Sequence, residues 1–174
     1  MDILLFIWLS SLPIDLGLPG QYTAPNKYSN NDKNIFIVHG HDEESKLTLS
    51  NLLYDLGLKP LVLHDMPNQG RTIIEKFERN AGLAKYAFIL LTPDDIGGKN
   101  AQNLNSRARQ NVIFELGFFI GALGRDRVCC IYRKGVELPS DIDGLVYLPY
   151  AQSVRECDMG IMRELKDAGY SIKL

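Results

Sequence analysis

The 174-residue sequence lacks the features that mark several large classes of protein. It contains only three cysteines and no CxxC spacing, which argues against a disulfide framework and predicts a reducing, cytoplasmic compartment. It has no long basic tract, so nucleic acid is not expected as a partner. The apolar run Ile3 to Leu9 is far shorter than the roughly 20 residues of a membrane-spanning helix. No membrane partner is expected either.

Three common nucleotide and hydrolase motifs are also missing. No GxGxxG follows the first predicted strand, which argues against a nicotinamide-dependent dehydrogenase. The phosphate-binding pattern GxxxxGK[ST] and the nucleophile pattern GxSxG are absent as well. What remains is a chain with 45% apolar and 23% charged residues and a net charge of −2, which is the composition of an ordinary globular domain.

The first 33 residues read as an extension that precedes the domain. Asp2 stands where a signal peptide would carry positive charge, and no small-x-small cleavage pattern follows. We interpret the apolar run of this segment as a short docking helix or as the remnant of an upstream module. Residues 26–34 form a polar linker, and the domain is predicted to span 34–174.

From residue 35 onward, short apolar runs alternate with helical patterns. Asp42 is a candidate N-cap and Gly57 a candidate stop for the first helix, and a polar loop is expected over residues 93–106. The predicted strands are 35–38, 60–64, 86–92, 127–132 and 144–150, and the predicted helices are 43–56, 71–80, one that contains Glu115, and 154–168.

This alternation predicts an α/β fold with a flavodoxin-like, doubly wound parallel sheet of five strands in the order 2-1-3-4-5. In such a sheet the winding direction changes between the first and third strands, and ligands bind outside the carboxyl ends of the strands at that point. The polar segments HGHDEE and TPDDIGG leave the sheet at this edge. We therefore expect the functional site there.

Glu115 is the most informative single residue, because it is the one carboxylate in the run VIFELGFFI. A helical wheel places it beside the apolar stripe rather than within it, so it is predicted to lie at the boundary of the core. Two interpretations stay open. Glu115 pairs with Arg107, Arg109 or a backbone group, or it lines a pocket whose apolar wall sets its reactivity. The stripe itself is predicted to contain Val112, Leu116, Phe119, Ile120 and Leu123.

The turn after the first strand carries His39, Gly40, His41 and Asp42. Two histidines without a third ligand in register are weak evidence for a metal, and no metal is predicted. A tight turn at Gly40 would offer backbone N–H groups and imidazoles to a phosphate at the start of the next helix. The alternative is a turn that only caps that helix.

Four further polar residues are candidates for substrate binding. Arg71 would hold a phosphate or another subunit, or would simply be solvated. Asp94 and Asp95 would bind a ribose hydroxyl or start a turn. Asn111 lies one turn before Glu115, in line with it on the predicted helix.

Five segments carry a resemblance to a known family. They are IFIVHGHDEESK (35–46), LVLHDMPNQGRTIIEKFE (61–78), ILLTPDDIGG (89–98), RARQNVIFELGFFIGALGR (107–125) and VELPSDIDGLVYLP (136–149). Together they resemble the bacterial TIR-like nucleotide-binding domain, which is found in effectors of cyclic-nucleotide-signalled anti-phage systems. The resemblance covers residues 35 to about 150 in order. Its specificity comes from the combination, since each segment alone is modest.

The resemblance implies an activity and a catalytic residue. Members of this kind hydrolyse NAD+ to nicotinamide and ADP-ribose products when a sensor module clusters them, and the family's catalytic glutamate falls on Glu115. NAD+ is then the substrate, no separate cofactor is expected, and Gly117 and Gly121 would let the helix pack closely on the sheet. Expected partners are other copies of the domain and a cyclic-nucleotide sensor module in cis or in trans. A non-catalytic assembly module and a nucleoside deoxyribosyltransferase-like enzyme stay as alternatives.

Overall fold

The computed structural model describes residues 33–62, 81–98, 100–140 and 144–173. Its main element is a five-stranded sheet in which all neighbouring strands run parallel, in the order β2-β1-β3-β6-β7. The predicted strand order is therefore confirmed. The strands are β1 (Asn34–Val38), β2 (Lys59–Val62), β3 (Ala87–Leu91), β6 (Val128–Arg133) and β7 (Val146–Tyr150).

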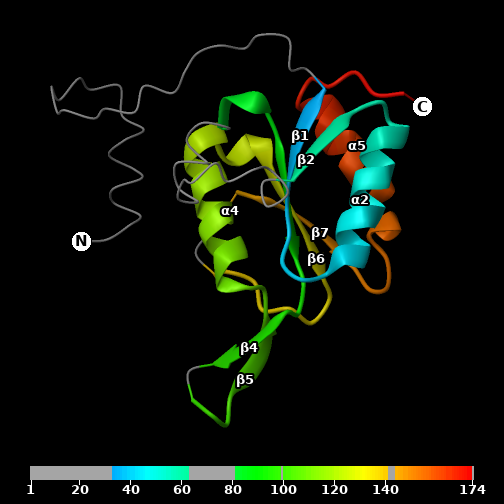
Figure 1. The fold of residues 1–174 in the computed structure, drawn as a ribbon. Helices are drawn as coiled ribbons and strands as arrows, with labels where there is room; N and C mark the ends of the chain where they lie inside the picture. Colours follow the sequence, from blue (N-terminus) through cyan, green and yellow to red (C-terminus); the bar gives the residue numbers. More distant parts are fainter. Residues whose placement is uncertain (1–32, 63–80, 99, 141–143, 174) are drawn as a thin grey trace, which may run out of the picture.

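Helices cover both faces of this sheet. Figure 1 shows α2 (Glu43–Asp55) and α5 (Asp158–Asp167) on one side and α4 (Gln110–Leu123) on the other. The central strand β3 is buried along its whole length, as a parallel strand covered on both faces requires. Neighbouring residues of a strand consequently belong to different cores. Ile35 and Ile37 point to the side of α2 and α5, whereas Phe36 and Val38 point to α4.

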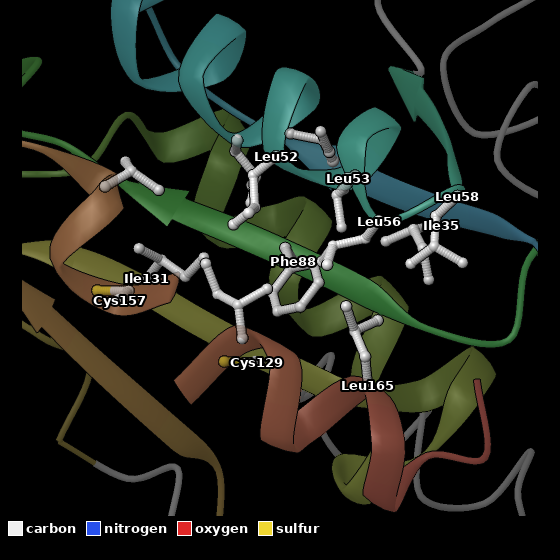
Figure 2. Packing of buried hydrophobic residues seen from close by; sticks show 14 of the residues in the cluster. Ile35, Leu52, Leu53, Leu56, Leu58, Phe88, Cys129, Ile131, Cys157 and Leu165 are labelled. Atoms are coloured by element: carbon white, nitrogen blue, oxygen red, sulfur yellow. The ribbon is translucent and has the colours of Figure 1, made fainter. Parts of the chain in front are cut away.

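The core under α2 and α5 is built around Phe88 of β3. Figure 2 shows Leu52 and Leu53 of α2 and Leu165 of α5 around this ring. The core under α4 is centred on Phe119, whose ring lies 4.9 Å from that of Phe36 in β1. Each helix therefore stays in place through an apolar face that the sheet removes from water.

Helix boundaries follow the capping signals of the sequence. The Asp42 carboxylate accepts a hydrogen bond from the Ser45 N–H at 2.9 Å, so α2 begins where the N-cap predicts. Gly57 takes a φ of +79° just beyond the C-cap, a conformation that favours glycine and ends the helix. The last predicted helix consists of two parts, the 3-10 turn η4 (Val154–Cys157) and α5.

The loop predicted over residues 93–106 is wrong in one respect, because this segment contains an antiparallel hairpin. Its strands are β4 (Asp95–Gly98) and β5 (Leu104–Arg107). Glycine and asparagine in these strands mask the usual strand pattern. The hairpin gains support from the next loop, since the Glu137 N–H donates to the Ser106 carbonyl at 2.8 Å. In Figure 1 it extends away from the sheet at the end where α4 begins.

Some predictions fall on parts of the chain that the structure does not describe. These are the helix over 71–80, the last two residues of the strand over 60–64, and the segment before residue 33. Within the described ranges, no helix has the length and apolar character needed to cross a membrane.

Candidate functional site

Two loops that are far apart in the sequence meet at the carboxyl ends of β1 and β3. The backbone N–H of His41 donates to Asp94 Oδ2 at 3.2 Å, across 53 residues of sequence. The hydroxyl of Thr92 donates to the same oxygen at 3.0 Å. Asp94 thus links the end of β3 to the turn after β1, at the point where the winding direction of the sheet changes. The sequence analysis did not identify Thr92 as a candidate site residue, although Thr92 directly follows β3.

Gly40 leaves room for this close approach. A Cβ atom built at Gly40 would collide with the carboxylate of Asp94. The absence of a side chain therefore lets the β1 turn and Asp94 come into contact. The predicted tight turn at Gly40 has this physical explanation.

The start of α2 is occupied by carboxylates. Asp42 accepts from the N–H and from the hydroxyl of Ser45, both at 2.9 Å, and Asp94 accepts from His41. Glu43 and Glu44 add negative charge in the first turn of the helix. A phosphate at this helix start would meet these carboxylates, so the geometry agrees with the capping interpretation of the turn.

The two histidines of the turn have different environments. His39 is buried, and its Nδ1 lies 3.9 Å from Glu43 Oε1, whereas His41 is exposed. Glu43 also pairs with Lys46, and the hydrogen bond from Lys46 is the main reason that the pKa of the Glu43 carboxyl is lowered. In the described part of the chain, no three His, Cys, Asp or Glu residues are grouped as metal ligands would be.

Glu115 lies deeper in the protein than the helical wheel predicts. It is only 2% exposed and belongs to the buried face of α4 with Val112, Leu116 and Phe119. The prediction of a boundary position is therefore wrong. A wheel reports the direction of a side chain from the helix axis, but not how far neighbouring segments cover the helix. Here α4 packs against β1, β3, β6 and the short turn η2 (Ala81–Leu83), a wider surface than one apolar stripe.

The height of Glu115 along the sheet follows from the topology. Since β3 and β6 are parallel and α4 connects them, α4 runs back along the sheet, and its first turns lie at the carboxyl ends of the strands. Phe119 packs on Phe36, and Glu115 precedes Phe119 by one turn, about 6 Å of helix. This rise places Glu115 near the level of Val38. The carboxylate and the β1 turn therefore occupy the same end of the molecule.

Arg107 is not the ion-pair partner of Glu115. Its Nε and one terminal nitrogen donate to the two carboxylate oxygens of Glu137, at 2.7 and 2.9 Å. This pair is the main cause of the raised pKa of Arg107. It closes the hairpin onto the loop after β6, and Gly97 lies directly beneath the guanidinium group. Glu137 was not among the residues that the sequence analysis singled out.

The other candidates are spread around this edge. Asp95 is the first residue of β4 and is half-buried, opposite Arg107 in the hairpin register. Asn111 is exposed in the first turn of α4. Arg71 lies outside the described residues.

The role predicted for two glycines of α4 is wrong. Among the described residues, a Cβ atom at Gly117 would meet nothing within 4 Å, and Gly121 is exposed. Neither glycine therefore mediates close packing of the helix on the sheet. The apolar contacts of α4 come from side chains such as Leu116 and Phe119 instead.

Comparison with known families decides the affiliation of the chain. Residues 34–152 match the family described as "CAP12/Pycsar effector protein, TIR domain". The chain belongs to this TIR-domain family. The resemblance stated from the sequence is thereby confirmed, and the parallel sheet with helices on both faces agrees with it.

The aligned region makes up a different fraction of each relative. Over 116 residues the chain is 43% identical to the uncharacterized protein YuaY of Escherichia coli K12, which is 66% of this chain and 39% of that protein. Protein tirC of Dictyostelium discoideum is 33% identical over 141 residues, 74% of this chain and 70% of tirC. The Pycsar effector protein PaPycTIR of Pseudomonas aeruginosa is 38% identical over 79 residues, 44% of this chain and 25% of the effector. The chain therefore spans well under half the length of YuaY and of PaPycTIR.

Proposed function

We propose that this TIR domain cleaves NAD+ at the bond between nicotinamide and ribose, with Glu115 as the catalytic carboxylate. The observation that carries the proposal is the position of Glu115. It is a buried carboxylate on α4, at the same end of the sheet as the β1 turn and Asp94. Membership of the TIR-domain family supports the assignment.

Cleavage of the bond between nicotinamide and ribose needs few catalytic groups beyond one carboxylate. Nicotinamide leaves as a neutral molecule from a cationic pyridinium, so its departure needs no general acid. The ribose left behind carries positive charge at C1′, which a nearby carboxylate stabilises or traps, as in retaining glycosidases. Burial of Glu115 among apolar residues excludes water and strengthens this interaction.

Asp94 is placed to accept a hydrogen bond from a ribose hydroxyl. Oδ2 accepts from His41 and Thr92, while Oδ1 accepts no hydrogen bond from the described residues. A hydroxyl of the substrate would supply the missing donor. We assign further contacts with the substrate to the other residues predicted to bind it: His39, Gly40, His41, Asp42, Arg71, Asp95 and Asn111.

Activity is proposed to depend on clustering of the domain. Two relatives are named Pycsar effector proteins, and this chain covers 25% and 26% of their lengths. A sensor of a cyclic nucleotide, joined to the domain or supplied separately, would bring copies together in an anti-phage response. The isolated chain should then be weakly active, and its activity should rise more than linearly with concentration.

The test is incubation of concentrated protein with NAD+, with and without enforced clustering, followed by detection of released nicotinamide. Release that increases steeply with concentration or clustering supports the proposal. No release at any concentration or degree of clustering overturns the enzymatic assignment and favours a non-catalytic assembly module. Activity that is strictly linear in protein concentration, with a fully active monomer, would contradict the clustering requirement but not the enzymatic assignment.

A further inference from the structure

A chain of hydroxyl groups connects the edge of the sheet to the β1 turn. The hydroxyl of Tyr150 lies 2.9 Å from Ser45 Oγ, and Ser45 Oγ donates to Asp42 Oδ2 at 2.9 Å. A serine hydroxyl has a single proton, which here is used on Asp42. Tyr150 must therefore be the donor to Ser45. The direction of the chain is from tyrosine to serine to aspartate.

These three residues belong to different elements. Tyr150 is the last residue of the edge strand β7, Ser45 lies in the first turn of α2, and Asp42 closes the turn after β1. Tyr150 and Ser45 are 105 residues apart in sequence and are exposed by 1% and 7%. A hydrogen bond between buried groups is costly to break, because each partner then loses part of what compensates for its lost hydration.

The tyrosine end of the chain is itself held in place. The turn that follows Tyr150 donates three backbone N–H groups to the carboxylate of Glu156, at 3.0, 2.8 and 3.0 Å. Ser153 and Glu156 complete a capping box at the start of η4. The carboxyl end of β7 is thus a fixed point from which the hydroxyl chain reaches the site.

We propose that Tyr150 and Ser45 are positioning residues for the proposed NAD+ cleavage. They act through Asp42, whose carboxylate they hold, and so set the position of the turn from His39 to Asp42. Neither residue is assigned a contact with the substrate. The inference rests on the proposed function. It extends the proposed site to the end of β7, the edge strand on the opposite side of the sheet from β2.

The experiment compares Tyr150→Phe, Ser45→Ala and the double variant in the full chain, under clustering conditions. Each single substitution should raise KM for NAD+ by roughly three- to tenfold, the range that one hydrogen bond of ordinary strength supports, with kcat within twofold of the wild type. The double variant should match the single variants rather than multiply their effects, because both changes break the same chain.

Tyr86→Phe is the matched control. Tyr86 is as buried as Tyr150, and its hydroxyl donates to Glu164 Oε2 at 3.1 Å, but it precedes β3 at the opposite end of the sheet. It should lower Tm by a similar amount and leave KM unchanged. Equal KM values for the wild type, Tyr150→Phe and Tyr86→Phe would overturn the positioning role and leave the proposed function intact. A wild-type protein that releases no nicotinamide would overturn both.

Discussion

The two faces of the sheet bury different polar groups. Under α2 and α5, two buried tyrosine hydroxyls are hydrogen-bonded, Tyr86 to Glu164 and Tyr150 to Ser45. Under α4 the buried group is the carboxylate of Glu115, next to Leu116 and Phe119. A hydroxyl loses little on burial when it is hydrogen-bonded, whereas a carboxylate loses far more hydration. Burial of Glu115 on the α4 face therefore costs more hydration than burial of the two tyrosine hydroxyls on the α2 and α5 face.

The largest losses of stability should come from substitutions in the two apolar cores. The losses should be similar on the two faces of the sheet. Phe119→Ala removes a fully buried ring that packs on Phe36 and should lower the free energy of unfolding by about 3–5 kcal/mol. Leu53→Ala on the other face should cost about 2–5 kcal/mol. Chemical denaturation measures both. A loss below about 1 kcal/mol at either position would show that this face does not hold the fold together.

The three cysteine thiols test burial on both faces of the sheet, because each face should shield its thiols from a reagent in solution. Burial raises the pKa of Cys130, on the α4 side, to about 12. Burial, with the charges of Glu156 and Asp158, raises that of Cys157, on the other side, to about 11. Burial also raises the pKa of Cys129. A thiol reagent near neutral pH should therefore label none of the three in the native protein and all three after denaturation.

The same shifts predict how stability changes at alkaline pH. The folded-state pKa values lie above the ordinary value of 9.0, so the native protein keeps protons that the unfolded chain loses. This contribution is complete below pH 9 and disappears as the pH rises through 11 to 12. Denaturation midpoints measured between pH 8 and 11 should decline. In the labelling experiment, rapid reaction of any of the three thiols in the native protein would contradict the burial of that thiol.

The smallest effect is expected from Glu156, which is exposed. Backbone N–H groups of Ser153, Gln152 and Ala151 lower the pKa of its carboxyl to about 2, from an ordinary value of 4.5. Its contribution to stability is therefore present above pH 4.5 and lost as the pH falls toward 2. Glu156→Gln should lower Tm slightly at pH 7 and flatten the decline of Tm between pH 4.5 and 2. An unchanged decline in the variant would assign it to other carboxyl groups.

The strands and their order were predictable because each strand is a short apolar run, which is the pattern of a parallel sheet buried on both faces. The first helix was predictable from Asp42 and Gly57, whose capping roles depend on local sequence alone. The hairpin was not, because the glycines and asparagines of residues 95–107 carry no strand signal. Arg107 of its second strand also donates to Glu137 from a later loop, a contact that no local pattern reports.

The sequence predicted which edge of the sheet brings the candidate residues together, but not the contacts between them. The topology of the sheet puts the β1 turn, Asp94 and the start of α4 at one edge, as expected from strand order. The hydrogen bond between His41 and Asp94 and the chain from Tyr150 to Ser45 join distant parts of the sequence, so no local pattern reports them. The burial of Glu115 depends on segments that cover α4, which a helical wheel does not represent.

The most direct test of the account is the variant Glu115→Gln, with nicotinamide release and Tm measured on the same sample. The substitution keeps the volume of the side chain and removes its charge. Release should fall by roughly two orders of magnitude or more, as expected when the partner of a transition-state charge is lost, while Tm stays equal or rises slightly. Asp167→Asn, at the exposed end of α5, is the control and should change neither quantity. A Glu115→Gln protein that is destabilised by about 3 kcal/mol or more, yet releases nicotinamide at the wild-type rate per folded molecule, would contradict the catalytic role and assign Glu115 to a buried ion pair.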